Sequence, residues 1–435
     1  MKTTQFTAKT ALSSALVTAM LMAAQSTQAA GLTIGQEPLF LTEGVAPNLL
    51  VTLDDSGSMA YAFAPDSISG RSTTRRFRSS DYNPMYYNPN TTYARPKSVT
   101  FNSRTGLIST TEYTTSYTQA YINGFKPNLG SINLSNDYLV TTTHTPDSTS
   151  QSQANHPSSD FNRTGRASAA YYYVRDNSLS NCNGTLEDDD CYRLVWVSSA
   201  EQQNFANWYS FYRTRTLATA SAANLAFLSL PDNVRVTWQM LNTCRSIGSG
   251  NCSGADNSYS NYLRNFANQH REGFFSWLAD LPASGSTPLR AAAQRAGNFL
   301  STTGVNGPWA YAPGTTTSPQ YSCRSTYHIL MTDGLWNGSL STDVGDTDGT
   351  SRTLPDGTAY TARAPFRDGA SRNDENTLAD LAFKYWAEDA NTNLANGLKP
   401  FIPATNADPA TQYWDPRNNP ATWQHMVTYT LGLGL

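Results

Sequence analysis

The chain of 435 residues carries little charge. Asp, Glu, Lys and Arg together make up 14% of it, and the 33 acidic residues nearly balance the 30 basic ones. The formal net charge of −3 provides no general positive field for gripping phosphates, which argues against nucleic acid as a partner. With 39% hydrophobic and 11% aromatic residues, the chain is also too apolar to be a charge-rich disordered segment. The composition therefore favours a folded protein with a sizeable core.

Long apolar runs are scarce as well. One run, at residues 11–24, follows Lys2 and Lys9 and precedes a small-residue stretch that ends at Ala30. This arrangement is typical of a secretory signal peptide, which we place at residues 1–30. No later segment approaches the ~20 apolar residues that span a bilayer. We therefore predict an exported chain whose mature form has no transmembrane segment.

Cysteine is rare, and its spacing indicates local disulfides. Four of the five cysteines form two pairs that are close in sequence, Cys182 with Cys191 and Cys244 with Cys252. Such pairs are expected to form disulfides in the oxidising compartment that a signal peptide implies. Cys323 is left over: it could be a reactive thiol with His328 as its base, but a semi-buried free thiol beside a strand is the favoured interpretation. The sequence contains no Cys/His spacing typical of zinc sites.

Apolar segments alternate with amphipathic ones along most of the chain. Strands are expected at residues 48–53, 234–241, 327–332 and 426–433, and helices at about 198–228, 266–281, 287–300 and 376–389. Continuous apolar segments are typical of strands buried on both faces of a parallel sheet. The alternation predicts an α/β fold with a doubly wound, mainly parallel sheet, whose binding groups lie at the carboxyl ends of the strands.

Local sequence signals predict where two of these helices begin and that one histidine of another helix is packed. Ser198 and Glu201 have the spacing of a capping box at the start of the first helix. Thr287 is expected to cap the third helix, with Pro288 in its first position. His270 falls on the apolar stripe of the second helix, so we interpret it as a packed residue rather than a ligand.

Two long segments interrupt the alternation, at about 61–197 and 336–372, and the first is rich in Tyr. Each follows the carboxyl end of a predicted strand, so we expect both insertions to emerge at the same edge of the sheet. Within the first, the NPMYYNP segment and the three tyrosines at 171–173 could form a recognition surface or could serve local packing. Because no repeat or Gly/Ser linker is present, we assign residues 31–435 to one domain with insertions.

Oxygen-bearing side chains gather at the expected carboxyl edge. Asp54, Ser56 and Ser58 follow the first strand, while Thr287 and Asp333 lie on two other loops of the proposed sheet. Carboxylates and neutral hydroxyls suit a hard divalent cation, which wants about six oxygens and usually keeps some water. We expect Mg²⁺, with Mn²⁺ and Ca²⁺ as alternatives. An ion with one position held only by water can accept an acidic group from a partner.

Three segments in order carry a family resemblance. DDSGSM after an apolar strand, GSTPL before a helix and ILMTDG at a later strand resemble the von Willebrand factor A domain. The resemblance implies a doubly wound domain with a metal-ion-dependent adhesion site. In such a site Ser56, Ser58 and Thr287 would be the hydroxyl ligands, while Asp54 and Asp333 would bind the ion directly or through water.

A second resemblance spans most of the mature chain. The signal peptide, DDSGSMAY, NPMYYNP, QNFANWYSFYRTRTLAT and WQHMVTYTLGLGL together resemble the amino-terminal region of type IV pilus tip adhesins of the PilY/PilC kind. The resemblance implies an adhesion and pilus-biogenesis factor found in the periplasm or outer membrane, at the cell surface and at the pilus tip. Minor pilins and a host or surface receptor presenting an acidic group would be its partners. The carboxyl-terminal β-propeller usual in that family is not present in this chain.

Two other functions are weighed against adhesion. An extracellular metal-assisted hydrolase would need a general base beside the ion, for which Asp55 and His328 are the candidates. No GxSxG elbow, HExxH or P-loop motif supports an enzyme. A purely structural component that assembles or caps the pilus is the third possibility. We favour a binder over a catalyst.

Two acidic stretches are interpreted as solvated. The residues Asp343, Asp346 and Asp348 before Gly349 resemble a calcium loop, but the D-x-[DN]-x-[DN]-G pattern fails because its first position is Val344. We therefore expect a solvated acidic loop. The acidic run at residues 187–190, inside the first cysteine pair, is likewise expected to face solvent.

Overall fold

The computed structural model describes residues 45–158, 160–161, 167–250, 252, 260–311, 319–369 and 375–433. The proposed signal peptide, residues 1–30, lies outside this part of the chain. Within the described residues, no helix combines the length and apolar character needed to cross a membrane.

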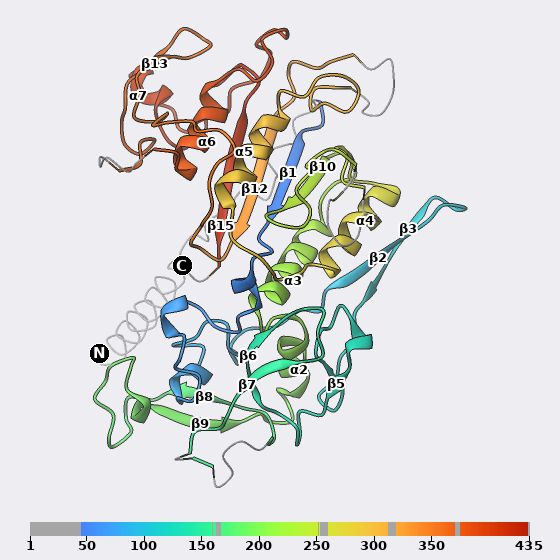
Figure 1. The fold of residues 1–435 in the computed structure, drawn as a ribbon, viewed down its shortest axis with the longest axis vertical. Helices are drawn as coiled ribbons and strands as arrows, with labels where there is room; N and C mark the ends of the chain where they lie inside the picture. The colour runs from blue at the N-terminus through green and yellow to red at the C-terminus, as the bar shows by residue number, and fades with distance from the viewer. Residues whose placement is uncertain are drawn as a thin grey trace, which may run out of the picture. The chain divides into compact units, whose positions relative to one another are not determined.

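A five-stranded sheet organises the chain, with strand order β11-β10-β1-β12-β15 (Figure 1). Its strands are β1 (Asn48–Leu53), β10 (Arg235–Met240), β11 (Arg264–Asn265), β12 (Thr326–Thr332) and β15 (Met426–Gly432). β1 is parallel to β10 and β12, and β12 is parallel to β15, whereas β11 runs antiparallel to β10. The mainly parallel sheet is therefore confirmed, and the short β11 was not predicted. All six residues of β1 are buried, as expected for a central strand.

The helices follow the predicted order between the strands. They are α2 (Gln202–Phe211), α3 (Arg215–Phe227), α4 (Asn268–Ala279), α5 (Leu289–Phe299), α6 (Leu378–Ala387) and the short α7 (Pro409–Tyr413). The helix expected over 198–228 is two helices. The backbone of Thr214 is extended, and its side chain accepts a hydrogen bond from Leu217 N, so Thr214 starts a new helix by capping it.

The predicted helix starts need correction. Pro288, not Thr287, is the N-cap of α5. The backbone of Thr287 instead forms two hydrogen bonds of 2.9 Å with Asn337: Thr287 N donates to Asn337 Oδ1, and Thr287 O accepts from Asn337 N. Ser198 Oγ does donate to the Glu201 carboxylate at 2.6 Å, but α2 begins only after Glu201. His270 is confirmed as a packed residue, since its ring stacks on Trp238 with centroids 4.9 Å apart.

The segment between β1 and α3 forms an aromatic region, residues 61–212, built from four hairpins and α2. The hairpins pair β2 (Lys97–Asn102) with β3 (Leu107–Glu112), β4 (Ala120–Tyr121) with β5 (Ser131–Ile132), β6 (Val140–His144) with β7 (Gln151–Ala154), and β8 (Tyr171–Arg175) with β9 (Tyr192–Trp196). Tyr86, Tyr87 and the tyrosines at 171–173 are all buried in its core, together with Phe205 and Trp208 of α2. These tyrosines therefore serve packing. Figure 1 shows β6 to β9 beyond the carboxyl end of β1.

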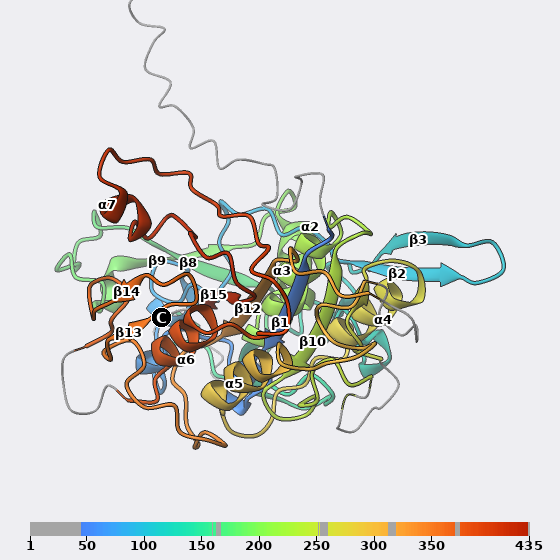
Figure 2. The same cartoon turned by 90° about the horizontal axis from the view of Figure 1, so that it is seen from above.

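The second insertion contains the hairpin of β13 (Arg352–Thr353) and β14 (Ala359–Tyr360). Its Tyr360 packs with Phe383 of α6 and with Trp423, which lies just before the amino end of β15. Figure 2 shows both strands beside α6. The insertion follows the carboxyl end of β12, and its hairpin lies beside α6. The prediction of a solvated acidic loop fits the exposed Asp343 but is wrong for Asp348, which is 0% exposed.

The cysteine predictions are mostly confirmed. The structure contains both expected disulfides, Cys182–Cys191 and Cys244–Cys252. Cys323 is free and exposed, whereas a semi-buried thiol was expected. His328 lies inside β12, fully buried, with Nε2 at 2.8 Å from Thr52 Oγ1. Its imidazole is thus engaged within the sheet and does not serve Cys323 as a base.

The acidic run at 187–190 is only partly solvated. Arg76 forms an ion pair of 3.1 Å with Asp189, and Arg75 forms one of 3.1 Å with Asp190. Asp188 caps a short 3₁₀ turn by accepting a hydrogen bond from Asp190 N. The run therefore joins the disulfide loop to residues 75 and 76 of the aromatic region.

Candidate metal centre

Asp54 is the first residue after the central strand β1, so it stands at the middle of the sheet's carboxyl edge. Its N–H donates to Met331 O of β12 at 3.0 Å. One carboxylate oxygen accepts a hydrogen bond from Ser56 N at 2.8 Å, and the other accepts one from Thr332 Oγ1 at 2.7 Å. These bonds fix the carboxylate, which is fully buried, against the end of β12.

The loop after Asp54 brings two hydroxyls together and meets a second loop. Ser56 Oγ and Ser58 Oγ are 3.1 Å apart. Gly57 N donates to Gly285 O at 3.1 Å, which holds the loop before α5 alongside the serines. Gly285 has a φ of 93°, a conformation that favours glycine, and a Cβ there would lie 2.9 Å from Asn242 Cγ. The contact between these loops thus depends on Gly285.

Thr287 and Asp333 are the remaining predicted ligands. Among the residues that the structure describes, Thr287 Oγ1 forms no hydrogen bond, while the backbone of Thr287 is held by Asn337. Asp333 follows β12 and is 9% exposed. Within the described part of the chain, its Oδ2 accepts from Arg215 Nη1 at 2.7 Å and its Oδ1 accepts no hydrogen bond. The other oxygen of this carboxylate remains available to an ion.

The charge of Asp333 acts on the carboxylate of Asp54. Burial raises the pKa of Asp54, and the nearby negative charge of Asp333 raises it further, against hydrogen bonds from Ser56 and Thr332 that lower it. Two carboxylates this close favour a shared cation, because a positive charge between them stabilises both ionised forms. The donor set of two carboxylates and three hydroxyls fits a hard divalent ion.

Arg215 is a residue of the candidate centre that the sequence did not reveal. Its guanidinium is 1% exposed and pairs with Asp333 at 2.7 Å and with Asp66 at 2.6 Å. It also donates twice to Phe63 O, at 2.9 and 2.7 Å. Arg215 is the first residue of α3, where the helix dipole disfavours a cation. That unfavourable placement is the one local signal that could have drawn attention to it.

Both general bases considered for a hydrolase are engaged elsewhere. Asp55 is fully buried and accepts four hydrogen bonds of 2.8 to 3.1 Å, two from Asn242 and two from Thr243. It therefore anchors the loop after β10 instead of facing the candidate ion. His328 lies in the interior of the sheet, where burial lowers its pKa to about 3. Neither side chain is placed to activate a water at the site.

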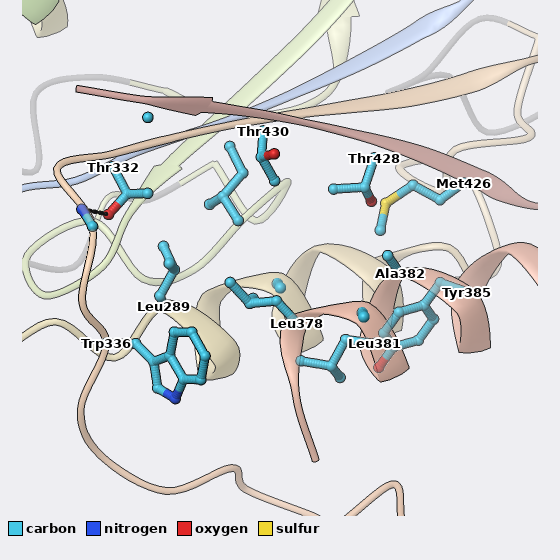
Figure 3. Close-up of a pocket in the computed structure, with 15 residues that line it drawn as sticks. Leu289, Thr332, Trp336, Leu378, Leu381, Ala382, Tyr385, Met426, Thr428 and Thr430 are labelled. Carbon is cyan, nitrogen blue, oxygen red and sulfur yellow. Dashed lines mark hydrogen bonds between the residues drawn. The ribbon is translucent and has the colours of Figure 1, made fainter. Parts of the chain in front are cut away.

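A cavity of about 450 Å³ lies next to the candidate centre, between the sheet and the helices α5 and α6. Its lining is mostly apolar, and Figure 3 shows Leu289, Trp336 and Leu378 on its helical side. Thr332 belongs to the cavity wall and also donates to Asp54. Gly334 N donates to Thr332 Oγ1 at 3.2 Å, the bond drawn in Figure 3. Thr332 therefore couples the cavity wall to the ligand loop.

Known proteins are similar to almost all of this chain. Type IV pilus biogenesis factor PilY1 of Pseudomonas aeruginosa is 54% identical over 431 residues in strain PAO1, 53% over 430 residues in strain PAK and 46% over 431 residues in strain UCBPP-PA14. Each match covers 98% of this chain but only 34–35% of the relative. The chain thus spans about a third of the length of these relatives. The predicted resemblance to the pilus biogenesis factors is confirmed. No family model and no solved structure matches the chain.

Proposed function

We propose that this chain is part of a type IV pilus-associated adhesion and biogenesis factor, and that it binds partners through a metal-ion-dependent adhesion site in a von Willebrand factor A-like domain. Its similarity to proteins named type IV pilus biogenesis factor supports the pilus role. The adhesion site rests on one observation, the meeting of three oxygen-bearing loops at the carboxyl edge. The bonds from Gly57 to Gly285 and from Thr332 to Asp54 hold those loops together.

The ion proposed for this site is Mg²⁺. Ser56, Ser58 and Thr287 would offer hydroxyl oxygens, and Asp54 and Asp333 would bind directly or through water. The two carboxylates nominally cancel the charge of the ion, but the guanidinium of Arg215 already offsets part of the charge on Asp333. The site would therefore keep a positive field, and the ion would complete its coordination with an acidic side chain of a partner.

The proposed partners are minor pilins and a host or surface receptor that presents an acidic group. The protein would act after export, at the cell surface and at the pilus tip. The aromatic region lies beyond the carboxyl end of β1 (Figure 1), so its hairpins could contribute the surface around the bound group. Specificity would then come from the aromatic region and attachment from the ion.

The test removes one ligand and measures binding and adhesion separately. Asp54→Ala should abolish the heat of Mg²⁺ binding in calorimetry, because it deletes the central carboxylate. Ser58→Ala is a milder second variant that leaves both carboxylates in place. Asp137→Ala, which changes an exposed residue, is the control and should bind Mg²⁺ normally.

The same changes are then introduced into the full-length protein in cells. We expect Asp54→Ala to reduce surface adhesion while pili still form. Adhesion that persists after Mg²⁺ binding is lost would show that the ion does not bridge to a partner. Normal Mg²⁺ binding by Asp54→Ala would show that the ion does not use this site.

A further inference from the structure

A second group of carboxylates lies apart from the carboxyl edge. Asp346 and Asp348 are in the turn before β13, and Asp380 is in the first turn of α6. One oxygen from each of these three residues lies within 4.8 Å of the others. Asp368 lies beside this group, since its backbone N–H donates to Asp348 Oδ2 at 3.3 Å, although its carboxylate is not one of the three. The chain thus brings four acidic residues together from three segments.

Some buried carboxylate oxygens of this acidic group have no hydrogen-bond partner within the described residues. Asp348 and Asp380 are both 0% exposed. Within the described part of the chain, the buried atoms Asp348 Oδ1 and Asp368 Oδ1 accept no hydrogen bond, and none of the four carboxylates forms an ion pair. Buried carboxylates are normally paired, hydrogen-bonded or bound to a metal. Two buried oxygens without a hydrogen bond in one acidic group therefore point to a cation-binding site.

The surrounding hydrogen bonds hold the carboxylates in place without exhausting them. Asp380 is the most engaged: its Oδ1 accepts from Thr347 N at 2.6 Å and from Asp348 N at 3.4 Å, and its Oδ2 accepts from Thr377 N at 3.0 Å as part of the capping box of α6. The hydroxyls of Thr347 and Thr377 also lie 3.3 and 3.2 Å from these oxygens. Asp346 accepts from Gly349 N at 2.6 Å. Because each carboxylate oxygen has two acceptor sites, the capacity left for an ion lies mainly on Asp346 and on Asp348, whose Oδ1 accepts no hydrogen bond within the described residues.

Gly349 makes room for the carboxylate of Asp346. A Cβ at position 349 would lie 2.2 Å from both oxygens of Asp346. Any other residue would have to push this carboxylate away from its present position. The turn is thus shaped to keep Asp346 beside the other acidic groups.

We propose that Asp346, Asp348 and Asp380, with Asp368 beside them, bind a Ca²⁺ ion at a site separate from the carboxyl edge. Calcium takes six to eight oxygens at about 2.3–2.6 Å in a flexible arrangement that can include several carboxylates. Mg²⁺ is usually held by only one or two carboxylates and keeps several waters. Three carboxylates whose ligand oxygens lie within 4.8 Å of one another therefore suit Ca²⁺ better than Mg²⁺.

The electrostatics of Asp348 agree with this geometry. Burial raises the pKa of Asp348 to about 6, and the charges of Asp368, Asp380 and Asp346 add to that effect. A divalent cation among these groups would favour their ionised forms. The ion would also join the turn before β13 and the segment around Asp368 to α6, so it would fasten the second insertion to the helix.

The local sequence pattern could not reveal this site. The calcium-loop motif fails at Val344, but the fold brings in Asp380 from a helix 32 residues beyond Asp348. The ligands are therefore distributed over the second insertion and α6 instead of following one another in a single loop.

The test is a titration with CaCl₂ alone, on the whole chain after treatment with EDTA. Because the edge site could also take Ca²⁺, the parent for this titration carries Asp54→Ala. We expect this parent to bind one Ca²⁺ and to gain thermal stability when it does. Adding Asp348→Asn, which keeps the shape of the side chain, should weaken binding at least tenfold and abolish the gain in melting temperature.

Matched variants and a second metal show whether Ca²⁺ binds at this acidic group. Asp343→Asn changes an exposed residue of the same loop and should leave Ca²⁺ binding unchanged. Asp346→Asn should weaken it as Asp348→Asn does, and MgCl₂ should bind the Asp54→Ala parent at least tenfold more weakly than CaCl₂. If the parent binds no Ca²⁺, or if Asp348→Asn binds it as tightly as the parent, the second site is refuted. Neither result affects Mg²⁺ binding at the edge, which is measured in the chain with Asp54 intact.

Discussion

The sheet and the aromatic region solve the problem of a stable core in different ways. In the sheet, strands far apart in sequence pair, as β1 does with β12, and the polar residues of the candidate centre gather at the strand ends. In the aromatic region, local hairpins enclose polar atoms inside the core itself. The hydroxyl of Tyr86 lies 2.7 Å from that of Tyr138 and donates to Tyr171 O at 3.0 Å.

This difference shows what tyrosine contributes to a region of short hairpins. Strands of two to six residues bury little aliphatic surface, whereas each tyrosine ring buries a large area and brings its own hydrogen-bonding group. The guanidinium of Arg78 enters the same network by donating to Tyr171 OH at 2.9 Å. The aromatic region is therefore expected to depend on its buried tyrosine hydroxyls.

The largest effect is expected where the two regions are joined. Arg215→Met should reduce the free energy of unfolding by about 3–5 kcal/mol, because it leaves the buried Asp333 and Phe63 O without their donor. Denaturant unfolding monitored by tryptophan fluorescence measures this loss. Arg193→Met removes an exposed pair of 3.5 Å with Asp176, which solvent screens, so it should leave the free energy of unfolding nearly unchanged. Equal losses for both variants would show that Arg215 does not join the regions energetically.

A smaller effect is expected inside the aromatic region. Tyr138→Phe keeps the ring but removes the hydroxyl that contacts Tyr86, so it should cost about 1–2 kcal/mol of unfolding free energy. Tyr311→Phe is the control, because the Tyr311 side chain is largely exposed. If the two changes had the same effect in denaturant unfolding, the buried hydroxyls would not contribute to stability.

The smallest changes in stability are expected when pH is varied. The sheet and the aromatic region should lose stability at different pH values. Burial raises the pKa of Tyr93, Tyr192 and Tyr212 to about 12, so the folded state favours their protonated forms. Their contribution to stability is complete below the ordinary Tyr pKa of 10.0 and is lost as pH rises from there towards 12. Hydrogen exchange should therefore show the aromatic region opening first in alkali. If β1 or β12 opened first, the expected lower stability of the aromatic region in alkali would be wrong.

In acid, hydrogen exchange should show the sheet opening before the aromatic region. Burial lowers the pKa of His270 and His425 to about 4 and that of His328 to about 3, and all three lie in or beside the sheet. Their contribution is complete above the ordinary His pKa of 6.5 and is lost as pH falls towards these values. His144 of β6, also lowered to about 3, is the exception in the aromatic region. His328→Gln should make the sheet's hydrogen exchange less sensitive to acid, and unchanged acid sensitivity would rule His328 out as its cause.

The sheet could be predicted because short, continuous segments of the sequence determine its strands. An apolar run such as residues 48–53 has few options besides a buried strand, and parallel strands must end at a common edge. That reasoning also placed Asp54 near Asp333. The break between α2 and α3 was missed because the apolar stripe continues across it, although Thr214 is a good capping residue.

The aromatic region and Arg215 could not be predicted in the same way. Tyr has no fixed preference for surface or core, and strands as short as β4 and β5 carry no periodicity. The partner of Arg215 lies 118 residues away, and the contact forms only once the aromatic region has folded against the sheet edge. Polar contacts over such distances leave no pattern in a single sequence.

The contacts of Arg215 also determine which segments of this protein can be exchanged with those of its relatives. The aromatic region ends at residue 212, so an exchange of residues 61–212 replaces position 66, which supplies one ion-pair partner of Arg215, but leaves the guanidinium behind. A chimera that keeps both ion pairs has to carry acids at positions 66 and 333 together with an arginine at 215. The junction of a modular swap therefore belongs inside α3, not in the turn before it.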